Sequence, residues 1–280
     1  MKDFIKYTYN MYMNILLTLN KRYLPYLISL VRSINDNNDN NINFYIFSND
    51  ITIFDIEKYR HYLSINNKFF IISIPEESLA NAPTSRRYPL NMYHRLLASK
   101  YLPMHVDKIL YLDPDIIVKG DLSSLYNLDL GDHYFAGASN VNSFLERFNQ
   151  IKNGASKKSK YINTGVLLMN IKKLRLEQNE EEIFTFIQKK KNLLTLPDQD
   201  VINALYGEKI ILIDRYIYNL SDRAITQYNL LKTNENKINL DWVEKNTKII
   251  HYLGRNKPWK NNYHGILKCY YDKYKIGEEI

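Results

Sequence analysis

The chain has 280 residues, of which 45% are hydrophobic and 24% are charged, and it carries a net charge of +8 at pH 7. This length and composition fit a globular protein with one large α/β domain or two small ones. A single cysteine, Cys269, rules out an intrachain disulfide and favours a reducing compartment.

Membrane insertion and secretion find little support in the sequence. No stretch approaches the ~18 consecutive apolar residues that a membrane-spanning helix needs. The segment up to Arg22 ends in Asn20 and Lys21 rather than in a small-residue cleavage site, so it makes a poor signal peptide. We therefore expect a cytoplasmic protein.

The positive charge favours an anionic partner, for which a nucleotide, a nucleic acid and an anionic membrane surface are the options. Lys and Arg are scattered rather than gathered in one arm, and the 24 tyrosines are spread along the chain as in core and rim packing. We therefore expect no nucleic acid among its partners.

The first part of the chain alternates between strand-like and helix-like segments. Three apolar runs predict strands, at residues 14–19, 43–47 and 69–74. Apolar residues recur at the spacing of one helix face from about Tyr23 to Ile34, and a polar segment at 55–63 precedes the third run. This alternation is typical of a parallel α/β sheet.

Two carboxylates follow the next predicted strand. Residues 76–90 read as a loop and residues 91–102 as a helix, which leads into the apolar run 108–112 and then into Asp113 and Asp115. Two buried acids at close range repel each other, so they need a cation or a hydrogen-bond network. Open α/β sheets place their ligands at the carboxyl ends of strands, which is where this pair lies.

The rest of the chain continues the alternation. We expect a strand at 134–139, a further apolar run at 161–170 and one charged helix at about 174–190. The segments 196–207 and 249–259 follow, without internal repeats or a long low-complexity linker. We predict a main domain over residues 1–260 and a basic, aromatic helical extension over residues 261–280.

Four motifs together resemble a known family. "YLDPDIIV" resembles the Asp-x-Asp motif of nucleotide-sugar glycosyltransferases with the GT-A fold. "YINTGVLLMNI", "LPDQDVIN" and "HYLGRNKPW" follow in the order and approximate spacing of glycosyltransferase family 8, and the resemblance runs from about Asn14 to Trp259. It implies a mostly parallel mixed sheet flanked by helices, with a small C-terminal appendage. It also implies retaining transfer of glucose or galactose from UDP-glucose or UDP-galactose.

The resemblance implies a metal site and a donor site. Asp113, Asp115 and His251 would hold Mn²⁺ or Mg²⁺, ions that suit carboxylate and imidazole ligands and neutralise a departing diphosphate. The residues expected to bind the donor are Thr18, Asn20, Tyr23, Arg95, Asp113, Asp115, Asn163, Asp198, Gly254 and Lys257. Among these, Tyr23 would stack on uracil, and Asn163 and Asp198 would hold the sugar hydroxyls.

Gln199 matches the polar residue beneath the anomeric carbon, and Asp198 is the second catalytic candidate. An amide is a poor nucleophile, so the sequence is compatible with attack by the acceptor on the face from which the diphosphate departs. The alternative is double displacement, with Asp198 or Asp200 as the nucleophile.

Alternatives to a glycosyltransferase are a haloacid-dehalogenase-type Mg²⁺ phosphatase and a non-catalytic nucleotide-sugar-binding protein. The phosphatase motif usually lies near the N-terminus and continues with a small hydroxyl residue, whereas Ile116 and Ile117 follow here. We expect the acceptor to be a glycan, a lipid-linked glycan or a glycoprotein. A basic C-terminal region would allow peripheral membrane contact, through Lys257, Lys260, Lys268, Lys273 and Lys275.

Overall fold

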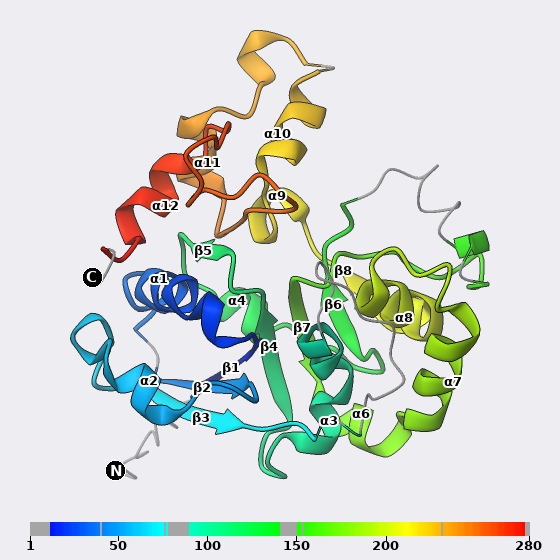
Figure 1. Ribbon diagram of the computed structural model, residues 1–280. Helices are drawn as coiled ribbons and strands as arrows, with labels where there is room; N and C mark the ends of the chain where they lie inside the picture. Colours follow the sequence, from blue (N-terminus) through cyan, green and yellow to red (C-terminus); the bar gives the residue numbers. More distant parts are fainter. Residues whose placement is uncertain are drawn as a thin grey trace, which may run out of the picture.

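The structure, a computed structural model, describes residues 12–39, 41–75, 77, 90–140, 150–152, 154–230 and 232–277. A seven-stranded sheet in the order β3-β2-β1-β4-β7-β6-β8 forms its centre (Figure 1). The strands are β1 (Met13–Thr18), β2 (Ile42–Phe47), β3 (Lys68–Ile72), β4 (Lys108–Leu112), β6 (Phe135–Gly137), β7 (Val166–Asn170) and β8 (Ile210–Leu212).

The sheet is mixed, and its direction changes beside β4. Strands β1, β2 and β3 are parallel, and β4 is parallel to β1, as the alternating pattern of the sequence predicts. On its other edge β4 pairs antiparallel with β7, so that Leu110 lies between Ile15 and Leu168. The chain order thus reverses at β4, and the residues after Leu112 lie at the switch point where open α/β sheets bind ligands.

Both faces of the sheet are buried. Successive residues of β1 point to opposite faces, so Ile15 and Leu17 join one core with Leu27 of helix α1 (Leu24–Asn35), while Leu16 joins a second core with Leu97. Burial on both sides explains why the strands read as continuous apolar runs in the sequence.

The α-helices surround the sheet, and α10, α11 and α12 gather at one end of the molecule (Figure 1, top). Those after α1 are α2 (Ile53–Glu57), α3 (Ala98–Tyr101), α4 (Ser123–Tyr126), α6 (Ile171–Glu177), α7 (Glu180–Lys190), α8 (Pro197–Tyr206), α9 (Arg215–Tyr218), α10 (Asp222–Asn229), α11 (Leu240–Asn246) and α12 (Lys268–Tyr274). Short 3₁₀ helices are η1 (Lys21–Tyr23), η2 (Arg60–Tyr62), η4 (Leu90–Leu97), η5 (Gly207–Lys209) and η6 (Asn234–Asn236).

Two helix predictions need correction. The single charged helix expected at about 174–190 is wrong, because α6 ends at Glu177 and Gln178 is extended. Asn179 then starts α7, its side chain accepting hydrogen bonds from two backbone N–H groups of the first turn. The helix expected at 91–102 is mostly the 3₁₀ helix η4, followed by the short α3.

A second, two-stranded sheet joins the acid pair to the C-terminal region. Strand β5 (Ile116–Val118) pairs antiparallel with β9 (Ile249–His251), and this register sets Ile116 opposite His251. A third apolar cluster lies next to it and includes Leu220, Ile250 and Tyr271. Among the described residues, every helix is too short or too polar to cross a membrane.

Candidate active site

The acid pair lies in the bend between β4 and β5. Backbone hydrogen bonds hold both residues: the Asp113 N–H donates to the Gly165 carbonyl at 2.8 Å, and the Asp115 carbonyl accepts from the Tyr252 N–H at 3.1 Å. Pro114 separates them. The two side chains remain partly accessible, with exposed fractions of 24% for Asp113 and 12% for Asp115.

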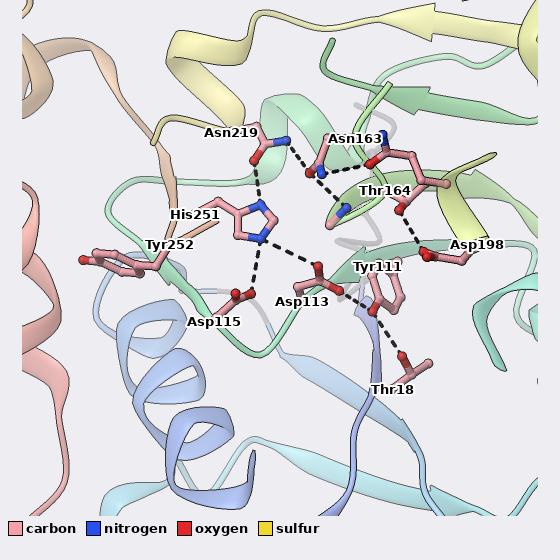
Figure 2. A network of polar contacts seen from close by, with 12 residues as sticks. Thr18, Tyr111, Asp113, Asp115, Asn163, Thr164, Asp198, Asn219, His251 and Tyr252 are labelled. Carbon is pink, nitrogen blue, oxygen red and sulfur yellow. Dashed lines mark hydrogen bonds and ion pairs between the residues drawn. The ribbon is translucent and has the colours of Figure 1, made fainter. Parts of the chain in front are cut away.

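His251 completes the acidic end of the site (Figure 2). Its Nε2 lies 3.2 Å from Asp115 Oδ1 and 3.6 Å from Asp113 Oδ2. The ligand atoms of the three side chains lie within 4.8 Å of one another. The register of β5 with β9 places the histidine here, although it is far from the acids in the sequence.

Lys257 also contacts this cluster. Its ammonium forms an ion pair with Asp115 and donates to the Tyr252 carbonyl at 2.7 Å. Burial alone would raise the pKa of Asp115, but Lys257 and His251 hold that pKa below its ordinary value. Asp115 is therefore a carboxylate at neutral pH, with Lys257 as its nearest cation.

Arg95 is the buried cation of the site, with an exposed fraction of 4%. Its guanidinium lies 3.0 Å from Asp113 Oδ1 and 3.2 Å from Asp198 Oδ2, and it donates to the Thr164 carbonyl at 2.8 Å. The guanidinium carbon also lies 4.1 Å from the centre of the Tyr111 ring. The family resemblance predicts that Arg95 binds the donor. The structure shows that Arg95 forms ion pairs with both Asp113 and Asp198.

The first turn of α8 supplies the next group of polar side chains. Asp198 accepts from Thr164 Oγ1 at 2.9 Å, and burial raises its pKa against the opposing effect of Arg95. Gln199 Oε1 accepts from Asn163 Nδ2 at 3.2 Å. Both residues are almost fully buried.

Asp200 has a different role from its neighbours in α8. Its carboxylate accepts from the Tyr161 hydroxyl at 2.9 Å, from the Thr195 and Leu196 N–H groups at 2.9 and 3.2 Å, and from Lys152 at 3.2 Å. These bonds hold the start of the helix. Asp200 is absent from the described residues that line the cavity, which disfavours it as a nucleophile.

A cavity of about 490 Å³ contains both groups of polar residues. The predicted residues that line it are Tyr23, Arg95, Asp113, Asp115, Asn163, Asp198, Gln199, His251, Gly254 and Lys257. A smaller adjoining cavity of about 150 Å³ is lined by Thr18 and Asn20 together with Tyr23, Arg95 and the acid pair. The structure therefore brings all the predicted site residues to one place.

The end of strand β1 is linked to the acid pair through a tyrosine. Thr18 Oγ1 lies 3.1 Å from the Tyr111 hydroxyl, which donates to Asp113 Oδ1 at 2.6 Å. Burial raises the pKa of Tyr111 well above its usual value, although Arg95 opposes this, so the phenol keeps the proton that it donates. Asn20 accepts from the Arg22 N–H and thereby starts η1.

Three functional positions were missed by the sequence reasoning: Tyr111, Gly165 and Asn219. A Cβ atom at Gly165 would lie 2.1 Å from His251 Cε1 and 2.7 Å from Asp113 Oδ2, so only glycine fits. Gly165 stands in the "NTG" stretch, which was a usable signal. Asn219 contacts His251, but nothing in the sequence around it indicates this.

A mixed α/β sheet with an acid cluster beyond its central strand is typical of ligand-binding α/β enzymes. The pattern that defines glycosyl transferase family 8 matches residues 14–263, so the chain belongs to this family and is a glycosyltransferase. A Haemophilus influenzae relative is 30% identical over 261 residues, which cover 88% of this chain and 73% of that protein.

Two further similarities bear on the fold and the chemistry. The lipopolysaccharide 1,2-glucosyltransferase of Escherichia coli K12 is 31% identical over 66% of this chain, which spans 54% of that enzyme. A crystal structure of the galactosyltransferase LgtC with donor and acceptor sugar analogues superposes with a TM-score of 0.79 at 24% identity, covering 95% of this chain and 98% of the other. The GT-A fold predicted from the sequence is therefore confirmed.

The two alternative readings receive no support. Family membership argues against both a phosphatase and a non-catalytic binder. In addition, Asp113, which would be the phosphatase nucleophile, is engaged by Arg95 and by the Tyr111 hydroxyl.

Proposed function

We propose that this protein transfers glucose or galactose from UDP-glucose or UDP-galactose to a glycan, a lipid-linked glycan or a glycoprotein, with retention of configuration and with Mn²⁺ or Mg²⁺. The observation that carries the proposal is the shared cavity, in which the group Asp113, Asp115 and His251, which could hold a metal ion, faces the side chains that we propose bind the sugar. The named relative and the named structural neighbour, a glucosyltransferase and a galactosyltransferase, support a hexose donor.

The metal-ligand set would be Asp113, Asp115 and His251. Two carboxylates and an imidazole suit a hard or borderline divalent ion, and the partial exposure of both acids leaves room for phosphate oxygens. When bound, such an ion neutralises the charge that develops on the departing diphosphate.

The nucleotide would occupy the part of the cavity near β1. Thr18, Asn20 and Tyr23 line the smaller cavity, where an aromatic ring and two short polar side chains suit a base and a ribose. Tyr23 is 37% exposed, so its ring has a face available for stacking.

The diphosphate would lie between the acid pair and the loop after β9. Gly254 has φ of +80° with open space where a Cβ would lie, so the backbone can approach a phosphate closely. Lys257 supplies a flexible positive charge. It pairs with Asp115 Oδ2, whereas His251 Nε2 lies 3.2 Å from Asp115 Oδ1, so Oδ1 is the oxygen that would face the metal.

The sugar would lie against Asn163, Asp198 and Gln199. Arg95 and Thr164 hold Asp198, and Asn163 holds the Gln199 amide, so these groups are positioned before the donor arrives. In same-face transfer the bond between the acceptor oxygen and C1 forms as the bond from C1 to the phosphate oxygen breaks. The acceptor proton passes to the departing diphosphate.

The basic C-terminal region supports a proposal of peripheral membrane contact. Lys260, Lys268 and Lys275 line a groove of about 1220 Å³ between α1 and α12, together with Tyr26 and Trp259. Asp272 pairs with Lys268 and Lys275 and offsets part of this charge. Flotation with vesicles containing anionic lipid tests the contact, and flotation equal to that with neutral vesicles contradicts it. A cytoplasmic location and the domain boundary at residue 260 also remain predictions.

Hydrolysis of a panel of nucleotide sugars tests the proposed donor and the metal requirement. With Mn²⁺ we expect free hexose and UDP from UDP-glucose or UDP-galactose, and loss of this activity with a chelator. Release of inorganic phosphate indicates a phosphatase, and unchanged turnover with the chelator refutes the metal requirement. Anomeric analysis of the transferred product by NMR tests retention.

A further inference from the structure

Asn219 connects the two ends of the cavity and is fully buried. Its Oδ1 lies 2.8 Å from His251 Nδ1, and its Nδ2 lies 3.0 Å from Asn163 Oδ1 (Figure 2). The next residue, Leu220, bridges to β9 through backbone hydrogen bonds with Ile249 and His251. The fold therefore holds Asn219 beside the histidine.

The direction of this hydrogen-bond chain is fixed by the backbone. The Gly165 N–H can only donate, and it lies 3.2 Å from Asn163 Oδ1, so the Asn163 atom at that position must be the oxygen. Asn219 must then present its NH₂ group to this oxygen, which turns its own carbonyl oxygen toward His251. On the other side, Asn163 Nδ2 donates to Gln199 Oε1.

This direction determines the tautomer of the neutral His251 ring. The Asn219 carbonyl oxygen can only accept, so the ring carries its hydrogen on Nδ1 and has a lone pair on Nε2. Nε2 is the atom that faces Asp113 and Asp115. The ring therefore presents a ligand atom to the space between the acids.

We infer that Asn219 is a positioning residue that acts on both ends of the site. It holds His251 in the tautomer that a divalent ion needs, and it holds Asn163 against Gln199 on the sugar side. This inference rests on the proposed metal site. Residues that accept a hydrogen bond from a metal-ligating histidine typically contribute about 10–100-fold to metal affinity.

Binding of Mn²⁺ in the presence of saturating UDP tests the inference without turnover, with free Mn²⁺ followed by electron paramagnetic resonance. We expect Asn219→Ala to weaken Mn²⁺ binding by about 10–100-fold. Asn219→Asp keeps an acceptor for the Nδ1 hydrogen but loses the donor to Asn163, so its Mn²⁺ affinity should stay close to wild type while donor hydrolysis falls. Equal losses of Mn²⁺ affinity in both variants overturn the inference.

A double-mutant cycle separates positioning from general damage to the fold. In a His251→Ala background, Asn219→Ala should cause no further loss of Mn²⁺ affinity, because the ring that it orients is gone. Additive losses overturn the inference. The matched control is Asn38→Ala. Asn38 is a buried asparagine outside the cavity that likewise donates one hydrogen bond and accepts another, and its removal should leave Mn²⁺ affinity unchanged.

The same measurements distinguish this inference from the proposed function. If the wild-type protein binds no Mn²⁺ with UDP, or if His251→Ala binds it equally well, the proposed metal site itself fails. If His251→Ala weakens binding and Asn219→Ala does not, only the role of Asn219 fails.

Discussion

The two ends of the cavity differ in how deeply their ion pairs are buried. At the sugar end Arg95 is buried between Asp113 and Asp198, and rigid hydrogen bonds fix the amide groups. At the metal end two partly exposed acids face a histidine, and the nearest cation of Asp115 is Lys257 on a loop. The groups at the sugar end are therefore preorganised, and we propose that the metal end takes up an added cation.

The largest effect is expected at the metal end. Asp115→Ala removes a proposed ligand and should abolish metal-dependent donor hydrolysis while the protein still folds, because Asp115 contributes no core packing. Hydrolysis rates with Mn²⁺ and circular dichroism measure the two properties. Asp121→Ala, outside the cavity, is the control, and wild-type rates in Asp115→Ala would refute the metal site.

At the sugar end a large loss of stability is expected. Arg95→Met leaves the acids Asp113 and Asp198 without their shared cation, which should lower the free energy of unfolding by about 3–5 kcal/mol. Urea unfolding measures this change. Lys257→Met is the matched removal of a cation at the metal end and should cost less, because Lys257 pairs with one acid whereas Arg95 pairs with two, of which Asp198 is almost fully buried. A larger loss in Lys257→Met contradicts the proposed difference between the two ends.

A smaller, purely kinetic effect is expected at Gln199. Gln199→Ala should lower the transfer rate about tenfold, the size of one lost neutral hydrogen bond, with little change in KM for the donor. Steady-state kinetics with varied donor check this split. A rise in KM with unchanged kcat would show that Gln199 binds the ground state and the transition state equally and contradicts a role specific to the transition state.

The mechanism itself can be tested at Asp198. Same-face transfer predicts that mass spectrometry of a slow-substrate reaction finds no sugar attached to the protein. A covalent adduct on Asp198 would instead establish double displacement.

The smallest effect is expected in the loop after β9, which we predict to close over the donor. UDP and Mn²⁺ together should slow tryptic cleavage at Arg255 and Lys257, and either ligand alone should do so less, because closure needs differential binding to the closed form. Cleavage at Lys58, which is exposed and lines neither cavity, serves as the internal reference. Unchanged cleavage with both ligands at saturation contradicts closure. It would indicate that the loop is already fixed without ligands, by the stacking of Trp259 on Tyr26 with their ring centres 3.7 Å apart.

The fold was largely predictable because its signals are local. Strand β4 and the acid pair are adjacent in the sequence, and the first four apolar runs match β1, β2, β3 and β4 to within one or two residues. The run at 161–170 begins five residues before β7, and β8 was not predicted. The interruption between α6 and α7 was missed although the sequence carries a signal for it, because Asn179 followed three residues later by Glu182 is typical of a helix start.

The site was less predictable where it depends on distant contacts. His251 was proposed from a family resemblance, since its position beside the acids depends on the register of β5 with β9. Asn219 depends on the backbone bridge of Leu220 to β9, and Tyr111 looked like any other buried strand residue. Such contacts between distant segments leave no periodicity or spacing in the sequence.

The hydrogen bond from the Asp113 N–H to the Gly165 carbonyl has a consequence for local unfolding. It extends the antiparallel β4/β7 ladder beyond Leu112, so this amide should exchange with deuterium only when the centre of the sheet opens. The His251 N–H bonds instead to Leu220, at the edge of a two-stranded sheet, and should exchange sooner. On gradual warming His251 should therefore lose its place before Asp113 does, so that metal binding disappears while the central sheet is still folded.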